Sequence, residues 1–258
     1  MRKTFRELLE ADEPIIGAFL QTYSPESVEI LAKAGYNYLT FDNEHGQFTD
    51  DQLVSLVRTA DSAGLATQIR IPALREELVK HALDLGAGSV MVPNINSADD
   101  AKKLVEYAKY PPDGNRGACP YVRANSWGID NTENNYASYY VKKNKETVLS
   151  VLVESPNGVE ELEDIIKVDG IDIIGIGTVD LSVALGVPGQ YNHSVITGAI
   201  NRLHELCHKY GKFCGNHADN AKEYLNNSSL KIFFAPPPPL QLYDAAKNYC
   251  NTIKEQLL

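Results

Sequence analysis

The stretches that decide the fold are IDIIGIG at residues 171–177 and SVMVPNI at residues 89–95. Both are short, nearly continuous apolar runs, which is typical of strands buried on both faces of a parallel sheet. Working outward from them, six more runs of this type predict strands at residues 15–22, 36–43, 65–71, 147–154, 212–218 and 230–235. Amphipathic stretches alternate with the strands and predict helices at residues 50–63, 75–85, 98–109, 158–166 and 194–210.

Eight strand–helix units in 258 residues predict a parallel α/β protein, and the number eight favours a (β/α)8 TIM barrel formed by residues 1–258 as one domain. Thr49 and Ser97 are expected to cap helices, and Gly64 and Gly211 to end them. Residues 110–144 break the alternation and predict an inserted loop region between units four and five. Four prolines at 236–239 end the eighth strand before a C-terminal helix at residues 237–258.

The charge balance restricts the partners of the protein. The chain carries 24 basic and 34 acidic residues, a formal net charge of −10, which argues against a nucleic acid or an anionic membrane as partner. No apolar run reaches the ~18 residues of a membrane span. The four cysteines are scattered without a CxxC pair, so we expect reduced thiols in a cytoplasmic protein and no structural zinc.

Two carboxylates stand where barrel enzymes carry reactive groups, at the carboxyl ends of strands. Glu154 ends the fifth predicted strand, and Asp180 follows the sixth. Two carboxylates with free space between them suit a hard divalent cation whose remaining positions are taken by water or substrate oxygens. The alternative is that Glu154 only caps the next helix and Asp180 only caps the turn into Leu181 and Ser182.

Three more polar residues follow the second and third strands. His45 can take up and release a proton near neutral pH, and Asp42 lies close enough in sequence to orient it. Arg70 is placed to hold a carboxylate by two parallel bonds, or else to pair with a neighbouring acidic residue. His217 is a weaker candidate at the end of the seventh strand, whereas His81, His204 and His208 on predicted helices are expected to be surface groups.

Six motifs together resemble the HpcH/HpaI family of class II pyruvate aldolases. In order along the chain they are FDNEHGQF (41–48), IRIP (69–72), LDLGAGSVMVPNINSADDAKKLV (83–105), YPPDGNRG (110–117), VLVES (151–155) and IGTVDLSVALG (176–186). The chain departs from the family at Leu152, where Gln is usual, at Val179 and Phe19, and in the stretch FFAPPPP at 233–239. The resemblance implies a (β/α)8 barrel, a trimer or hexamer of identical chains, and a Mg, Mn or Co ion that binds pyruvate.

The resemblance also implies roles for individual residues. Glu154 and Asp180 would be the metal ligands, and His45 the base, with Asp42 as its orienting partner. Arg70 would hold the keto acid. The main-chain amides of Gly177, Thr178, Val179 and Asp180 would contact the carboxylate of pyruvate.

These roles describe a metal-dependent aldolase that makes or breaks a carbon–carbon bond between pyruvate, as its enolate, and an aldehyde. The cation and Arg70 would stabilise the negative charge on the 2-oxygen, and His45 would remove the 4-hydroxyl proton. One alternative uses the same machinery for oxaloacetate decarboxylation or a biosynthetic condensation. Another is a non-catalytic barrel, which would bind no cation through Glu154 and Asp180.

Overall fold

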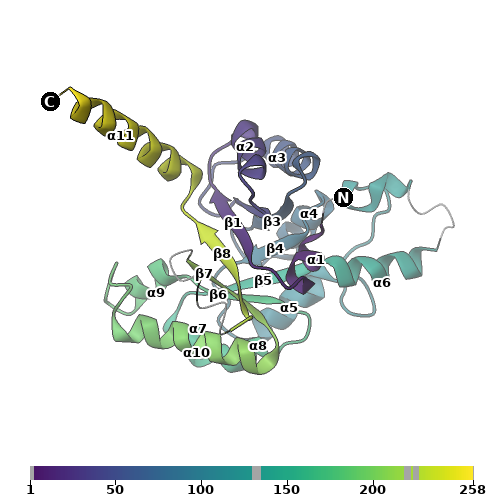
Figure 1. Cartoon of the computed structure of the whole chain (residues 1–258). Coiled ribbons are helices and arrows are strands. Elements are labelled where there is room, and N and C mark those ends of the chain that lie inside the picture. The colour runs from purple at the N-terminus through teal and green to yellow at the C-terminus, as the bar shows by residue number, and fades with distance from the viewer. Residues whose placement is uncertain (1–2, 130–134, 218–221, 223–226, 258) are drawn as a thin grey trace.

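Eight parallel strands close into a barrel, as predicted (Figure 1). The computed structural model describes residues 3–129, 135–217, 222 and 227–257. Each strand pairs with its neighbours in sequence, and the last pairs with the first. The strands are β1 (Ile15–Leu20), β2 (Tyr38–Asp42), β3 (Ala66–Arg70), β4 (Ser89–Val92), β5 (Val148–Val153), β6 (Ile173–Ile176), β7 (Phe213–His217) and β8 (Leu230–Ala235).

Helices surround the barrel and cover its outer face with apolar side chains. Their boundaries follow the capping signals: Thr49 and Ser97 accept hydrogen bonds from first-turn amides, and Gly64 and Gly211 end helices in the left-handed conformation. The helices are α1 (Phe5–Glu10), α2 (Pro25–Lys33), α3 (Asp50–Ala63), α4 (Glu76–Asp84), α5 (Ala98–Ala108), α6 (Tyr136–Glu146), α7 (Pro156–Glu160), α8 (Leu162–Ile166), α9 (Thr178–Ala184), α10 (Ser194–Tyr210) and α11 (Pro238–Gln256).

Two sequence predictions differ from the structure in detail. The helix predicted at 158–166 is two short helices, α7 and α8, and it begins earlier because Ser155 caps α7 with Pro156 at its first position. The predicted loop region 110–144 contains a 3₁₀ helix (Arg123–Gly128) and the first part of α6. Helix α6 is held there because Tyr140 packs on Tyr110, with ring centroids 4.3 Å apart.

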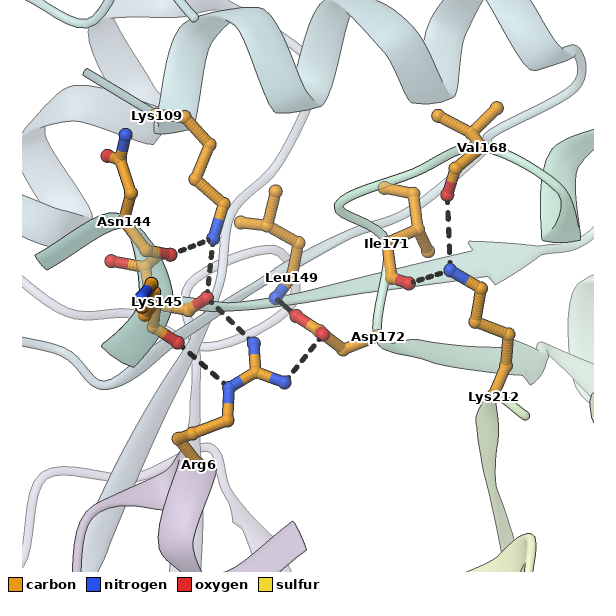
Figure 2. A network of polar contacts seen from close by, with 10 residues as sticks. Arg6, Lys109, Asn144, Lys145, Leu149, Val168, Ile171, Asp172 and Lys212 are labelled. Atoms are coloured by element: carbon orange, nitrogen blue, oxygen red, sulfur yellow. Dashed lines mark hydrogen bonds and ion pairs between the residues drawn. The ribbon is translucent and has the colours of Figure 1, made fainter. Parts of the chain in front are cut away.

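The amino-terminal end of the barrel is closed by α1. Phe5 and Leu9 are fully buried against inward-facing residues at the starts of the strands, including Tyr38. Polar contacts fix the same end (Figure 2): Arg6 donates to Asp172, which in turn accepts from the amide of Leu149. This end is therefore filled and tied down, and it is the opposite end that remains open.

A second polar contact at this end comes from a buried lysine. The ammonium of Lys109 donates to the carbonyls of Asn144 and Thr147, which lie at the join between α6 and β5 (Figure 2). Burial lowers the pKa of Lys109 to about 8. This desolvated cation thus joins the two ends of the long excursion.

Helix α11 extends away from the barrel as an isolated rod (Figure 1). None of its residues is buried, and Leu242, Tyr249 and Ile253 are exposed at helical spacing along one face, which Leu257, directly after the helix, continues. Within the described part of the chain, every helix is too short or too polar to cross a bilayer. All four cysteines are unpaired, as expected.

Candidate active site

One cavity of about 770 Å³ lies at the carboxyl ends of the strands and collects most of the predicted site residues. Its lining includes His45, Arg70 and Glu154 together with residues 177–180. Asp42 is fully buried beside it. These eight residues lie at or just after the ends of strands spread over the barrel sequence, and only closure of the barrel brings them to one opening.

Asp42 and Arg70 form the most extensive ion pair of the site. They are directly opposite each other in the β2–β3 register. Nε of Arg70 donates to Oδ1 at 2.8 Å, and Nη2 donates to Oδ2 at 2.6 Å. Burial alone would raise the pKa of Asp42, but the hydrogen bonds and charge of Arg70 outweigh it and lower that pKa. The ion-pair alternative for Arg70 is therefore what the structure shows.

Glu44 is a second carboxylate on the same guanidinium. Its Oε2 lies 3.2 Å from Nη1 of Arg70. Burial raises the pKa of Glu44, and the charges of Asp42 and Asp180 oppose its ionisation further. A guanidinium has five N–H groups, and Asp42 takes two of them in hydrogen bonds, so Arg70 keeps donors for a ligand in the cavity it lines.

His45 stands at the rim on the turn after β2, with 59% of its side chain exposed. Its amide, not its ring, contacts Asp42, at 3.3 Å from Oδ1. The imidazole Nε2 faces Glu44 instead, 3.8 Å from Oε2. Gly46 makes the turn possible, because a side chain there would overlap the carbonyl oxygen of Asp42. Asp42 thus orients the backbone that carries His45.

Glu154 is fixed at the top of β5 with only 5% of its surface exposed. The amide of Asn94 donates to its Oε2 at 2.9 Å. Asn94 has a positive φ of 56°, a conformation that Asn tolerates better than most residues. Gly177 lies against the carboxylate, and any side chain at that position would overlap Glu154.

Asp180 lies in the first turn of α9, on the exposed side of the cavity. No side chain caps this helix, so the amides of its first turn keep their hydrogen-bonding capacity. The amide of Gly177, by contrast, already donates to the carbonyl of Val153. Among residues 177–180, the amides of Thr178, Val179 and Asp180 therefore fit an anion better than that of Gly177.

The donor set fits a hard cation completed by substrate. Burial raises the pKa of Glu154, and the charges of Glu44 and Asp180 add to this, so a positive charge here would relieve their repulsion. No group of three or more metal-binding side chains occurs within the residues that the structure describes. Two carboxylates alone leave most of an octahedron to water and substrate oxygens.

Several residues of the site escaped the sequence predictions. The main-chain amide of Asn94 holds the carboxylate of Glu154. The side-chain amide of Gln21 holds that of Asp42, to which it donates at 3.0 Å. His204, predicted to be a surface group, lines the cavity because α10 packs over β6 and β7. The positive φ of Asn94 is a backbone property that composition does not reveal. The side chain of His217 lies outside the described residues.

The sequence model of the HpcH/HpaI aldolase/citrate lyase family matches residues 16–230, which is most of the chain. The chain belongs to the HpcH/HpaI aldolase/citrate lyase family. Membership in HpcH/HpaI confirms two predictions, the (β/α)8 barrel and an enzyme of the carbon–carbon lyase class.

Relatives of this HpcH/HpaI protein include named aldolases. The hydroxypyruvate/pyruvate aldolase of Paraburkholderia phytofirmans is 33% identical over 213 residues, 80% of each chain. The 5-keto-4-deoxy-D-glucarate aldolase of an Enterobacter species is 30% identical over 211 residues, 82% of this chain and 80% of the relative. An HpcH/HpaI family protein from Burkholderia cenocepacia has the same fold, with a TM-score of 0.87 at 30% identity over 96% of this chain and 98% of that one.

Proposed function

We propose that the protein is a metal-dependent aldolase that forms or cleaves a bond between the methyl carbon of pyruvate and an aldehyde. The observation that carries the proposal is the shared cavity of Glu154, Asp180, Arg70 and His45. No lysine lines this cavity within the described residues, which favours metal-assisted chemistry over a Schiff base.

The residues that would hold the cation are Glu154 and Asp180. Mg, Mn or Co fits their oxygen donors, and when bound it supplies positive charge beside the 2-oxygen of pyruvate, where negative charge develops as the bond breaks. Glu154 is immobilised for this task by the amide of Asn94 and by contact with Gly177.

Arg70 and the start of α9 bind the keto acid in this proposal. The guanidinium keeps its orientation because Asp42 and Glu44 hold it from one side. The uncapped amides of Thr178 to Asp180 offer donors to the carboxylate. Pyruvate is then held at both of its polar groups, which leaves its methyl carbon directed at the rest of the cavity.

His45 exchanges the proton in the bond-breaking step. In cleavage, its imidazole takes the 4-hydroxyl proton, the bond between carbons 3 and 4 breaks, and the electron pair passes to the pyruvate fragment as the aldehyde leaves. Glu44 is the charged neighbour that stabilises the protonated ring, 3.8 Å from Nε2. The exposed position of His45 at the rim lets it return the proton to water.

The alternative, oxaloacetate decarboxylation or a biosynthetic condensation, uses the same carboxylates and Arg70. The family description spans aldolases and citrate lyases, so this alternative is kept. Decarboxylation removes no hydroxyl proton. This alternative would be favoured if the wild-type protein showed no aldol activity and the His45→Ala variant decarboxylated oxaloacetate as fast as the wild type.

The test is exchange of the pyruvate methyl protons in deuterated water. We expect exchange that needs Mg²⁺ or Mn²⁺, stops on chelation with EDTA, and falls at least 100-fold in Glu154→Gln. Glu205→Gln, an exposed position on α10, is the matched control and should exchange normally. Binding of Mn²⁺, followed by electron paramagnetic resonance, should weaken in Glu154→Gln as well. Absence of exchange with Mg²⁺, Mn²⁺ and Co²⁺ would refute the proposal.

We also propose that the protein acts in the cytoplasm as a homo-oligomer, a trimer or hexamer. The apolar face of α11 supports a second copy of the chain as its occupant. This helix contributes no buried residue to its own barrel, so its apolar side chains stay in water unless another copy covers them.

A further inference from the structure

The cavity has an apolar part that the binding of pyruvate does not use. The groups proposed to bind pyruvate and the cation come from the turn after β2, from β3, from the end of β5 and from the start of α9. The rest of the lining is mostly apolar and includes Phe19 on β1, Leu152 on β5 and Phe234 on β8. Leu152 lies two residues before Glu154 and on the same inward face, so it forms the floor directly beneath the carboxylate.

Two glycines make room for this apolar surface. A side chain at Gly175 would overlap Leu152, and a side chain at Gly215 would overlap the ring of Phe234. The ring of Phe19 packs on that of Phe234 with centroids 5.3 Å apart. The guanidinium of Arg70 also contacts Phe19, with its central carbon 5.1 Å from the ring centroid. The apolar surface is thus continuous and directly borders the pyruvate-binding groups.

The charges around the cavity oppose a second anion. Four carboxylates, those of Asp42, Glu44, Glu154 and Asp180, lie in or beside the cavity, together with the guanidinium of Arg70 and the imidazoles of His45 and His204. Arg70 is already paired with two of the carboxylates, and no lysine or second arginine lines the cavity within the described residues. A divalent cation and pyruvate together add only one net positive charge, so an acceptor with its own carboxylate would enter a negative field.

We propose that the acceptor is an aldehyde with an apolar alkyl or aryl substituent, which packs on Phe19, Leu152 and Phe234. This inference rests on the proposed function and names the substrate class of the same site. In the addition direction, the pyruvate methyl carbon loses a proton and bonds to the aldehyde carbon, and the aldehyde oxygen takes up a proton. The substituent meanwhile leaves water for the apolar wall.

Matched aldehydes test the proposal with pyruvate and Mn²⁺. Butanal and acetaldehyde differ by two methylenes, and glyoxylate carries a carboxylate in place of the methyl group of acetaldehyde. At about fourfold for each of the two buried methylenes, we expect kcat/KM for butanal to exceed that for acetaldehyde about 15-fold. Glyoxylate should be the poorest of the three. In Leu152→Gln and Phe234→Ser the ratio of butanal to acetaldehyde should fall at least threefold, whereas in Val183→Gln, exposed on α9, it should not change.

If the variants do not fold, a binding measurement on the wild-type protein tests the proposal without turnover. Saturation-transfer NMR on the wild-type protein should detect 1-butanol in the cavity, competed by butanal, and should not detect glycolate. Glyoxylate turnover equal to that of butanal, together with normal methyl exchange of pyruvate, would overturn the apolar acceptor and leave the proposed function standing. Folded variants with an unchanged ratio would overturn it too. Loss of methyl exchange in the wild type would remove the proposed function and this inference together.

Discussion

At the scale of single residues, the decisive feature is the guanidinium of Arg70, which the carboxylates of Asp42 and Glu44 hold before any substrate binds. Asp42 is fully buried, and Arg70 has only 11% of its side chain exposed. Such a pair contributes little net stability, because desolvation offsets its attraction, but removing one partner leaves a buried charge. The pair therefore serves orientation: the guanidinium cannot turn away from the cavity without breaking two hydrogen bonds.

Substitution of Arg70 by Met should destabilise the protein by about 3–5 kcal/mol at pH 7, because Asp42 loses its partner. The double variant Asp42→Asn with Arg70→Met should recover part of this loss. Because the pKa of Asp42 is lowered, ionised Asp42 gives the wild-type protein more stability than neutral Asp42 does, and this difference is lost as pH falls through the folded pKa. The stability that Arg70→Met loses relative to the wild type should become smaller on acidification, because a neutral Asp42 tolerates burial better than an unpaired charge.

Urea unfolding at pH 7 and pH 5 measures these differences. Arg75→Met is the matched control, because Arg75 is exposed and pairs with Glu77 at the surface. An equal deficit in Arg70→Met and Arg75→Met would contradict the argument.

At the scale of elements, short turns after the strands place the carboxylates. Gly177 joins β6 to α9 and lets Glu154 lie against the backbone of the turn. Asn94, in the turn after β4, supplies the amide that fixes the same carboxylate. Two neighbouring elements thus hold Glu154 from either side, whereas Asp180 sits on the exposed first turn of α9.

Gly177→Ala should displace Glu154 and weaken Mn²⁺ binding about 10- to 100-fold, the range found when support of a metal ligand is lost. Gly198→Ala on α10 is the matched control, since an added methyl group there meets no atom within 4 Å. It should leave Mn²⁺ affinity unchanged and stabilise the protein by up to about 1 kcal/mol. Calorimetric titration with Mn²⁺ and thermal unfolding measure both effects, and equal Mn²⁺ affinity in the two variants would refute the role of Gly177.

At the scale of the whole molecule, stability and chemistry lie at opposite ends of the barrel. The amino-terminal end is closed by α1 and by the contacts of Arg6, Asp172 and Lys109 (Figure 2). The carboxyl end holds the cavity. This separation is general for (β/α)8 barrels, in which the carboxyl-end loops carry the reactive groups.

The buried Lys109 should make stability depend on pH in the alkaline range. Its pKa of about 8 lies below the ordinary 10.5, so between these values the unfolded chain binds more protons than the folded one. Stability therefore rises with pH over this window, by up to about 3 kcal/mol. Lys109→Met should lack this rise, which urea unfolding at pH 7.5 and pH 10 measures as a difference between the two proteins. Parallel pH profiles would contradict the assignment.

Helix α11 should control the assembly of the protein. Two charges on its apolar face, in Leu242→Glu with Ile253→Glu, should reduce the mass in solution to that of one chain, because buried carboxylates oppose contact between copies. Asn251→Glu on another face of the helix is the control and should keep the wild-type mass. Light scattering after size-exclusion chromatography decides. A wild-type protein that is already monomeric would refute the proposal.

The sequence by itself determined the eight strands, the main helices and their caps, since apolar periodicity and capping are local properties. It also identified Glu154, Asp180, Arg70 and His45 as strand-end groups. Only the tertiary structure decided which of them meet: Asp42 pairs with Arg70 because the β2–β3 register sets them opposite, and the ring of His45 faces Glu44. The apolar wall of Phe19, Leu152 and Phe234 likewise exists only in the closed barrel, because its members lie on strands far apart in the chain.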